Sequence, residues 1–333
     1  MEEKVKTSLT DKGMTIVKIS GNCMGTGGVR AHKRVKAKGE RVFCFIQRKI
    51  TTLREAGRHS TADHYQQALQ SLMRYRENVD LHFDAITPQF VLSYETWLRE
   101  RRLCRNSTSF YMRIMRTIYN KAVDACLTTD CRPFSAVYTG VDKTAKRAIT
   151  MADIRLIKRA NLSESPSLEF ARDMFLLSFY LRGIAPIDLA MLRKSDVSRG
   201  YLEYTRHKTG QKMRVYIEPE MRQILDKYEP ADTAYLLPLI KSEDGAAYRQ
   251  YRNSTRRINR YLKQLGERLR LSTPLTLYVA RHTWASVARH EHVPVSVISG
   301  AMGHDSEMTT QIYLASIQTS QIDDANSMII SRL

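Results

Sequence analysis

Apolar residues recur at helical spacing between Val42 and Val123. The run VFCFIQRKITTLREAG is followed by a second helix, ADHYQQALQSLMRYREN, for which Thr61 is the expected N-cap. A third helix opens with Thr87 and Pro88, a cap and first-turn pair. The fourth carries an apolar stripe formed by Tyr111, Ile114, Met115, Ile118 and Tyr119. The pattern predicts four helices that pack into a small all-α domain.

This periodicity stops between about residues 136 and 150, which predicts a linker. Beyond it, two β-rich arms flank the turn HKTGQK in YLEYTRHKTGQKMRVYIEP, a composition typical of a hairpin. Helical spacing returns from near Thr276, breaks at Gly303 and resumes in a last helix capped by Asp305 or Ser306. We therefore expect a mainly α fold with a small β-hairpin in its second part.

These changes divide the chain into five segments. They are an N-terminal segment (1–40), a helical domain (41–135), the linker (136–150), a mixed domain (151–316) and a C-terminal tail (317–333). The N-terminal segment fits DNA binding, a partner contact or disorder. The tail ends in an amphipathic helix candidate that docks either on a neighbouring protomer or on its own body.

The net charge indicates a nucleic-acid partner. Lys and Arg number 53 against 34 Asp and Glu, which gives +19 and a pI near 9.8. The excess is spread along the chain, and this suits a protein that follows a polyanion, because each neutralised phosphate releases a counterion. A ribosome-associated protein, or merely a basic surface, also fits the charge.

Other classes of protein fit the sequence less well. The five cysteines have no metal-binding spacing and are interpreted as reduced thiols of a cytosolic protein. No apolar run reaches the roughly 18 residues that span a bilayer. GTGG at 25–28 lacks the Lys-Ser/Thr of a phosphate loop, and no carboxylate or Cys/His metal motif is evident. We expect a cytoplasmic protein that needs no membrane, metal or cofactor.

The residues that carry chemistry concentrate in 280–315, ARHTWASVARHEHVPVSVISGAMGHDSEMTTQIYLA. Arg281 lies on the first helix of this stretch and His304 at the entrance of the last. Tyr313 follows nine residues later, about two and a half helical turns along. Phosphoryl transfer needs such parts: a nucleophile, fixed cations for the equatorial oxygens and a proton donor for the leaving oxygen.

This stretch resembles the C-terminal signature of the tyrosine recombinase (phage integrase) family. The matching residues are Arg281, His282, Gly303, His304, Thr310 and Tyr313. In addition, Lys208 in RHKTG matches the hairpin lysine of the family, and FLLSFYLRGIAPIDLAMLRKSDV resembles its first catalytic-arginine block. Similarity covers about residues 42–315 and is specific in the last third.

The resemblance implies a C-shaped, two-domain DNA clamp, with 41–135 as core-binding domain and 151–316 as catalytic domain. It implies a site-specific recombinase in which Tyr313 attacks a phosphodiester and holds a 3′-phosphotyrosine. Arg281 would clamp the phosphate, while His304 bonds the phosphate or assists the tyrosine. Lys208 would be the general acid for the leaving 5′-oxygen. Neither ATP nor metal is required.

Two departures from the family pattern concern the site. The first arginine of the family falls at Ala185, so the nearest arginine, Arg182, is the candidate substitute, with Gly183 giving the backbone room. This RG pattern resembles integrases of conjugative transposons and related mobile elements of anaerobic gut bacteria. The first histidine of the signature is replaced by Tyr278, whose phenol still donates a hydrogen bond.

Each site residue also has an ordinary structural explanation. Tyr313 fits the apolar face of an amphipathic helix, Arg281 a bridge to an acidic residue, His304 a helix cap and Lys208 a solvated hairpin tip. The remaining polar and aromatic neighbours are interpreted as DNA-backbone contacts or packing residues; they are Arg206, Lys212, His282 and Trp284. Their combined order and spacing favours the recombinase.

The expected partner is double-stranded DNA, bound by a homo-tetramer on paired recombination sites with accessory DNA-bending proteins. Two alternatives stay open: a catalytically impaired DNA-binding regulator of the same fold, and a type IB topoisomerase-like enzyme that cleaves without exchanging strands. An ordinary nuclease fits less well, because no cluster of metal-binding carboxylates stands out.

Overall fold

The computed structural model describes residues 40–142, 147–230, 232–242, 245–314 and 329–330, and only the backbone at 312 and 313. The chain divides into two compact units, Met1–Gly140 and Val141–Leu333. Residues 1–39 and most of the tail, on which two of the sequence-based expectations fall, lie outside the described residues. No helix in the described part is long and apolar enough to cross a membrane.

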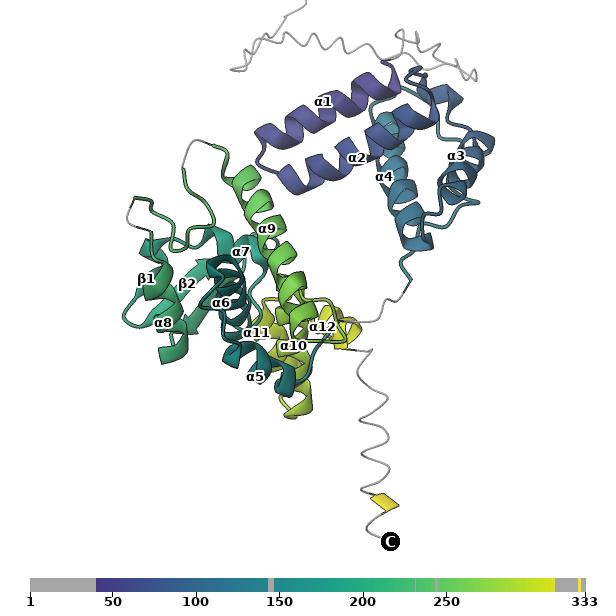
Figure 1. Cartoon of the computed structure of the whole chain (residues 1–333). Helices are drawn as coiled ribbons and strands as arrows, with labels where there is room; N and C mark the ends of the chain where they lie inside the picture. Colours follow the sequence, from purple (N-terminus) through teal and green to yellow (C-terminus); the bar gives the residue numbers. More distant parts are fainter. Residues whose placement is uncertain (1–39, 143–146, 231, 243–244, 315–328, 331–333) are drawn as a thin grey trace, which may run out of the picture. The chain divides into compact units, whose positions relative to one another are not determined.

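The first unit is helical in its described part (Figure 1). Its elements are α1 (Val42–Glu55), α2 (His59–Tyr75), the 3-10 helix η1 (Phe83–Ala85), α3 (Pro88–Glu100) and α4 (Arg105–Asp124). α1 packs along α2, and α4 contacts both α2 and α3. The predicted stripe of α4 faces the core, except that Ile114 is only partly buried. The four predicted α-helices are confirmed.

Helix starts in this unit follow capping chemistry at α3 and chain geometry at α2. Phe90 N donates to Thr87 Oγ1 at 3.2 Å and Pro88 takes the first helical position, as predicted. The predicted cap Thr61 is wrong, because α2 begins at His59. Gly57 adopts a left-handed φ of 70° that turns the chain directly after α1, so the second helix starts earlier.

The second unit combines helices with a small sheet. Its elements are α5 (Met151–Arg159), α6 (Pro166–Tyr180), α7 (Pro186–Met191), η2 (Lys194–Asp196), β1 (Val197–Ser198), β2 (Tyr201–Thr205), β3 (Lys212–Tyr216), α8 (Pro219–Tyr228), α9 (Ala247–Arg268), α10 (Leu277–His290), α11 (Val295–Met302) and α12 (Glu307–Leu314). The mainly α fold class with a small sheet is confirmed.

The predicted hairpin forms the greater part of an antiparallel sheet with the order β1-β2-β3. Tyr201 pairs with Tyr216 at its open end and Thr205 with Lys212 next to the turn. Along β3 the side chains alternate, with Met213 and Val215 buried and their neighbours exposed. One face of the sheet therefore packs on the core. Residues 206–211 connect β2 to β3 at the end of the hairpin where Thr205 pairs with Lys212.

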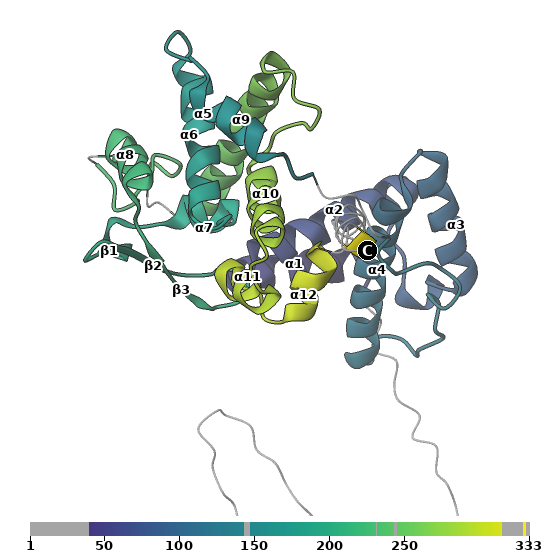
Figure 2. The same ribbon diagram turned by 90° about the horizontal axis from the view of Figure 1, so that it is seen from below.

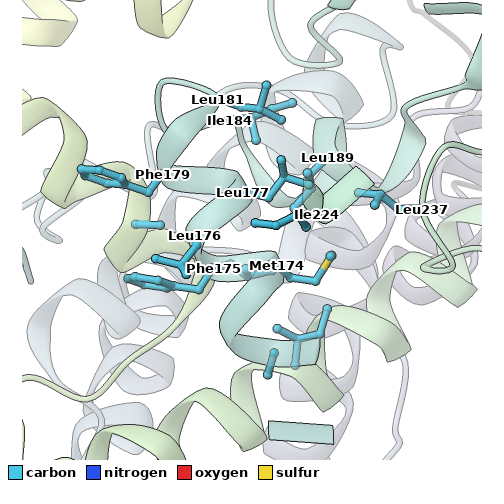
Figure 3. Packing of buried hydrophobic residues seen from close by; sticks show 14 of the residues in the cluster. Met174, Phe175, Leu176, Leu177, Phe179, Leu181, Ile184, Leu189, Ile224 and Leu237 are labelled. Atoms are coloured by element: carbon cyan, nitrogen blue, oxygen red, sulfur yellow. The ribbon is translucent and has the colours of Figure 1, made fainter. Parts of the chain in front are cut away.

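Helix α6 is the centre of this unit and contacts α5, α8, α9 and α10. Its middle is buried on nearly all sides, with Met174, Phe175, Leu176 and Leu177 in one hydrophobic cluster (Figure 3). Burial of each such side chain stabilises the fold by roughly 1.5–3 kcal/mol. The loop from α6 to α7 therefore begins at the end of a helix that is held in place by this packing.

The last three helices form a corner with its own small core (Figure 2). Its buried members are Ala285, Ala288, Ile298, Met302 and Leu314. The predicted helix start near Thr276 is confirmed, because Thr276 directly precedes α10. Gly303 ends α11 with a left-handed φ of 63°, and Ser306 Oγ accepts from Thr309 N at 3.4 Å at the start of α12.

Candidate active site

Arg281, in the middle of α10, is the buried cation of the corner and is 4% exposed. Its Nη1 donates to the carbonyl of Gly183 at 2.5 Å and its Nη2 to the carbonyl of Met302 at 2.8 Å. One guanidinium therefore joins the α6–α7 loop to the end of α11. Its planar fork fixes the direction of each N–H, as a phosphate clamp requires.

Gly183 makes this close approach sterically feasible. Arg182 and Gly183 are consecutive left-handed residues, with φ of 57° and 68°. A Cβ at position 183 would lie 2.7 Å from the Cα of Arg281. Only glycine fits here without displacement of the arginine backbone, because that contact involves main chain rather than a flexible side-chain end.

His304 follows the left-handed Gly303 and lies directly against this arginine. Arg281 Nη2 is 3.1 Å from His304 Nε2, and His304 Nδ1 is 2.8 Å from Thr310 Oγ1. Because a guanidinium only donates, Nε2 must accept, which assigns the ring proton to Nδ1. Thr310 Oγ1 then accepts from the ring.

The electrostatic surroundings keep this imidazole neutral. Burial and then the positive charges of Arg281, Arg206 and Lys208 lower the pKa of His304 from 6.5 to about 4. The charge of Lys208 acts on this ring although its side chain is exposed on the β2–β3 connection. The connection therefore brings its lysine to the same site as α10 and α12.

Arg206, at the root of that connection, is the second buried guanidinium, at 7% exposed. Its Nη1 donates to the carbonyl of Gly303, and its Nε lies 3.6 Å from Asp188 Oδ2. Asp188 is also buried, and its Oδ1 accepts from the backbone N of His207 at 2.9 Å. The carboxylate of Asp188 on α7 thus helps to hold Arg206 in place, and Arg206 in turn contacts Gly303.

Two further predicted residues lie at the edges of this cluster. Arg182 is partly exposed, and its Nη1 donates to the carbonyl of Arg214 on β3 at 3.4 Å. Tyr278, in the first turn of α10, is 55% exposed, with its ring 6.3 Å from that of His282. Burial and the charge of Asp188 raise the pKa of Tyr204, whereas the positive charges of Arg281, Arg206 and Arg182 lower it. All three guanidiniums therefore act on the same phenol.

Tyr313 belongs to α12, which is the helix that Thr310 connects to His304. The described part of this residue is its backbone, so its side chain lies outside the described structure. Position 313 is three residues after position 310, which is close to one helical turn. The backbone therefore sets the candidate nucleophile one turn beyond the residue that contacts His304.

Comparisons with known proteins match both units. The Phage integrase SAM-like domain matches residues 41–133, and the Phage integrase family matches residues 158–319. The chain belongs to the phage integrase family of tyrosine recombinases. It is thus a tyrosine site-specific recombinase that acts on DNA. A search of curated proteins gave no match.

Solved integrases share the fold. A lambda integrase dimer bound to a COC′ core site has 18% identity and a TM-score of 0.60, over 83% of this chain and 77% of that one. A lambda integrase tetramer bound to a Holliday junction gives 17% and 0.61, over 84% and 78%. The Tn1549 transposon integrase with transposon right-end DNA gives 12% and 0.57, over 86% and 99%.

The structure gives one residue a different place from the one that the sequence predicted. Arg206 was expected to be an ordinary DNA-backbone contact, yet it is buried between α7 and α11. Its position two residues before Lys208 at the end of β2 was the available signal. Trp284 packs against the hydrophobic clusters, as predicted.

Proposed function

We propose that this recombinase exchanges DNA strands through a 3′-phosphotyrosine formed on Tyr313. The contact between the buried Arg281 and the neutral His304, beside Arg206 and the exposed Lys208, carries the proposal. Cations fixed by backbone carbonyls are ready before substrate arrives, so they stabilise charge that develops on a phosphate without reorganising. The family membership supplies the reaction class.

The reaction consists of two balanced transesterifications. The Tyr313 oxygen attacks phosphorus and loses its proton, while the bond from phosphorus to the 5′-oxygen breaks and that oxygen takes up a proton. The 5′-hydroxyl of a partner strand then attacks the phosphotyrosine, and the phenol regains its proton as it leaves. The number of phosphoester bonds is unchanged, so no external energy source is needed.

The residues divide the work by position and chemistry. Arg281 and Arg206 bind the non-bridging oxygens, and Arg206 supplies the guanidinium that Ala185 does not; Arg182 is the alternative for this role. His304 assists loss of the phenolic proton through Nε2, whose lone pair is directed at Arg281 before DNA binds and becomes available when that guanidinium turns to the phosphate. Lys208 protonates the leaving 5′-oxygen.

At the edge of the site, Tyr278 donates a hydrogen bond to the phosphate in place of the usual histidine.

Assembly is proposed on the same basis. The helical domain (41–135) and the catalytic domain (151–316) hold double-stranded DNA as a clamp, joined by the linker (136–150), in the cytoplasm. The net charge of +19 supports this partner. Strand exchange requires several active sites, so four protomers act on paired DNA sites, and the tail (317–333) docks on a neighbouring protomer.

Removal of residues 317–333 tests the role of the tail. The shortened protein is expected to cleave DNA normally but to assemble poorly on paired sites in gel-shift assays. Unchanged assembly would refute the proposed role.

A suicide-substrate assay tests the chemistry. Binding sites are first selected from random-sequence DNA, and a nicked duplex that carries the selected site is then incubated with the enzyme. Wild type is expected to form an adduct stable to SDS, and Tyr313→Phe to bind DNA normally and form none. Tyr216→Phe, which alters an exposed phenol on β3, is the matched control and should form the adduct. Adduct without recombinant product would indicate a topoisomerase-like enzyme, and binding without adduct a regulator.

A further inference from the structure

Thr310 is a polar residue in the interior of the α10–α12 corner that the proposed reaction does not use. Its side chain is completely buried, whereas its neighbour Thr309 is exposed. Its hydroxyl lies 2.8 Å from His304 Nδ1. A buried hydroxyl without a partner costs about 1–3 kcal/mol, so this contact accounts for a polar group inside the corner.

The direction of this hydrogen bond follows from the other side of the ring. Arg281 Nη2 lies 3.1 Å from Nε2 and can only donate, so Nε2 presents its lone pair. The neutral imidazole then carries its proton on Nδ1, and Thr310 Oγ1 is the acceptor that stabilises this tautomer. The hydrogen-bond partner of Nδ1 thereby influences whether Nε2 can accept a proton or a hydrogen bond.

We infer that Thr310 is a positioning residue: as the acceptor for Nδ1–H it stabilises, together with Arg281 on the other side of the ring, the His304 tautomer in which Nε2 is the hydrogen-bond acceptor. The inference rests on the proposed role of His304 in loss of the phenolic proton of Tyr313. An imidazole protonated on Nε2 instead would have no lone pair to offer there. Because its side chain is completely buried against His304, Thr310 acts through the histidine.

The same hydrogen bond connects the tautomer to the placement of α12. Thr310 and Leu314 are buried on this eight-residue helix, while Met308 on the same helix is 63% exposed. Among the described side chains of α12 these two are the buried ones, so the hydrogen bond between Thr310 and His304 is one of the contacts that hold this helix in the corner. Position 313 lies one turn further along the same helix. The hydrogen bond from His304 to Thr310 therefore connects the state of the histidine ring to the position of the helix that carries the candidate nucleophile.

Three variants separate positioning from simple loss of stability. Thr310→Val keeps the shape and removes the hydroxyl, Thr310→Ser keeps the hydroxyl, and Thr309→Val makes the same chemical change on the exposed neighbour. The tautomer of His304 is measured by nitrogen-15 NMR on full-length protein without DNA, and cleavage by single-turnover adduct formation on the suicide duplex. Thermal unfolding checks that each variant is folded.

Wild type, Thr310→Ser and Thr309→Val are expected to show the Nδ1–H tautomer. Thr310→Val should show a mixture of tautomers and cleave about tenfold more slowly or worse, which is the rate equivalent of one lost hydrogen bond. A folded Thr310→Val with the wild-type tautomer would overturn the inference, as would an altered tautomer with unchanged cleavage. If wild type itself forms no adduct, the proposed function fails, while the NMR comparison still decides whether Thr310 sets the tautomer.

Discussion

Two charge clusters in the second unit, each built around a buried charged residue, differ in their balance of positive and negative groups. On α6, Asp173 accepts from Arg172 Nε at 2.8 Å, from Lys227 Nζ at 2.9 Å and from the hydroxyl of Tyr228 at 2.7 Å. Glu169 adds a second carboxylate to the two cations. This cluster connects α6 to α8 with its charges matched. Its arrangement is complete without any ligand.

The cluster around Arg281 has an excess of positive charge. Four cations, Arg182, Arg206, Lys208 and Arg281, act on its phenol and imidazole, and the opposing carboxylates are Asp188 and Asp305. Arg206 Nε has no hydrogen-bond partner among the described residues. Its nearest acceptor is the carboxylate of Asp188, which lies 3.6 Å away and offsets only part of the positive charge in this cluster. The comparison distinguishes a cluster that stabilises the fold from one arranged to bind an anion.

The largest expected effect is on cleavage after Arg281→Lys. Lysine cannot reach both carbonyls and a phosphate with fixed geometry, so the single-turnover rate should fall by about 10²–10³-fold. Binding of the duplex should change much less, because many phosphate contacts remain. Cleavage within a few-fold of wild type would place Arg281 among the structural residues with Asp173.

Asp173→Asn should have the reverse profile. Removal of one charge from a buried, matched cluster is expected to lower the free energy of unfolding by about 3 kcal/mol, measured in urea. Asp226→Asn, on an exposed ion pair of α8, is the matched control and should cost less than about 0.5 kcal/mol. Both folded variants should cleave normally, and a loss of cleavage in Asp173→Asn would erase the distinction between the two clusters.

Arg206 and Arg182 can be ranked by the same lysine substitution. Arg206→Lys should slow cleavage by about tenfold or more, because it disturbs a buried guanidinium that contacts Gly303 and Asp188. Arg182→Lys should have an effect below about threefold, since its hydrogen bond is to an edge carbonyl of β3. If the order of the two effects is reversed, Arg182 takes the place of the arginine missing at position 185.

The smallest effect concerns pH. The folded pKa of His304 is about 4, below its ordinary 6.5, so the unfolded chain binds the proton more readily. Stability from this group is complete above about pH 6.5 and is lost as pH falls toward 4. Between about pH 7 and about pH 5, wild type should therefore lose more unfolding free energy in urea than His304→Gln. Equal losses in the two proteins would show that the positive cluster does not depress this pKa.

Sequence periodicity predicted the helices of both units and the hairpin, because amphipathic spacing and turn composition are local properties. It failed at Thr61, where the tight turn at Gly57 outweighed a favourable capping residue. The order of Arg281, His304 and Tyr313 was visible for the same local reason, since these positions lie within a few consecutive helices.

The roles of neighbouring polar residues were much harder to predict. Asp188 and Arg206 are 18 positions apart on a helix and at a strand end, and each has an ordinary reason to be in solvent. Whether such a charge is buried depends on how α7, β2 and α11 pack against one another. No short window of residues contains that information.

The sequence by itself determined the elements, the basic charge and the spacing of the signature residues, because each depends on neighbours along the chain or on composition. Tertiary packing decided which guanidiniums are buried, which carbonyls hold them and which nitrogen of His304 carries the proton. The reason is physical: desolvation and hydrogen-bond direction are set by groups that folding brings together, such as Gly183 and Arg281, which are 98 residues apart along the chain.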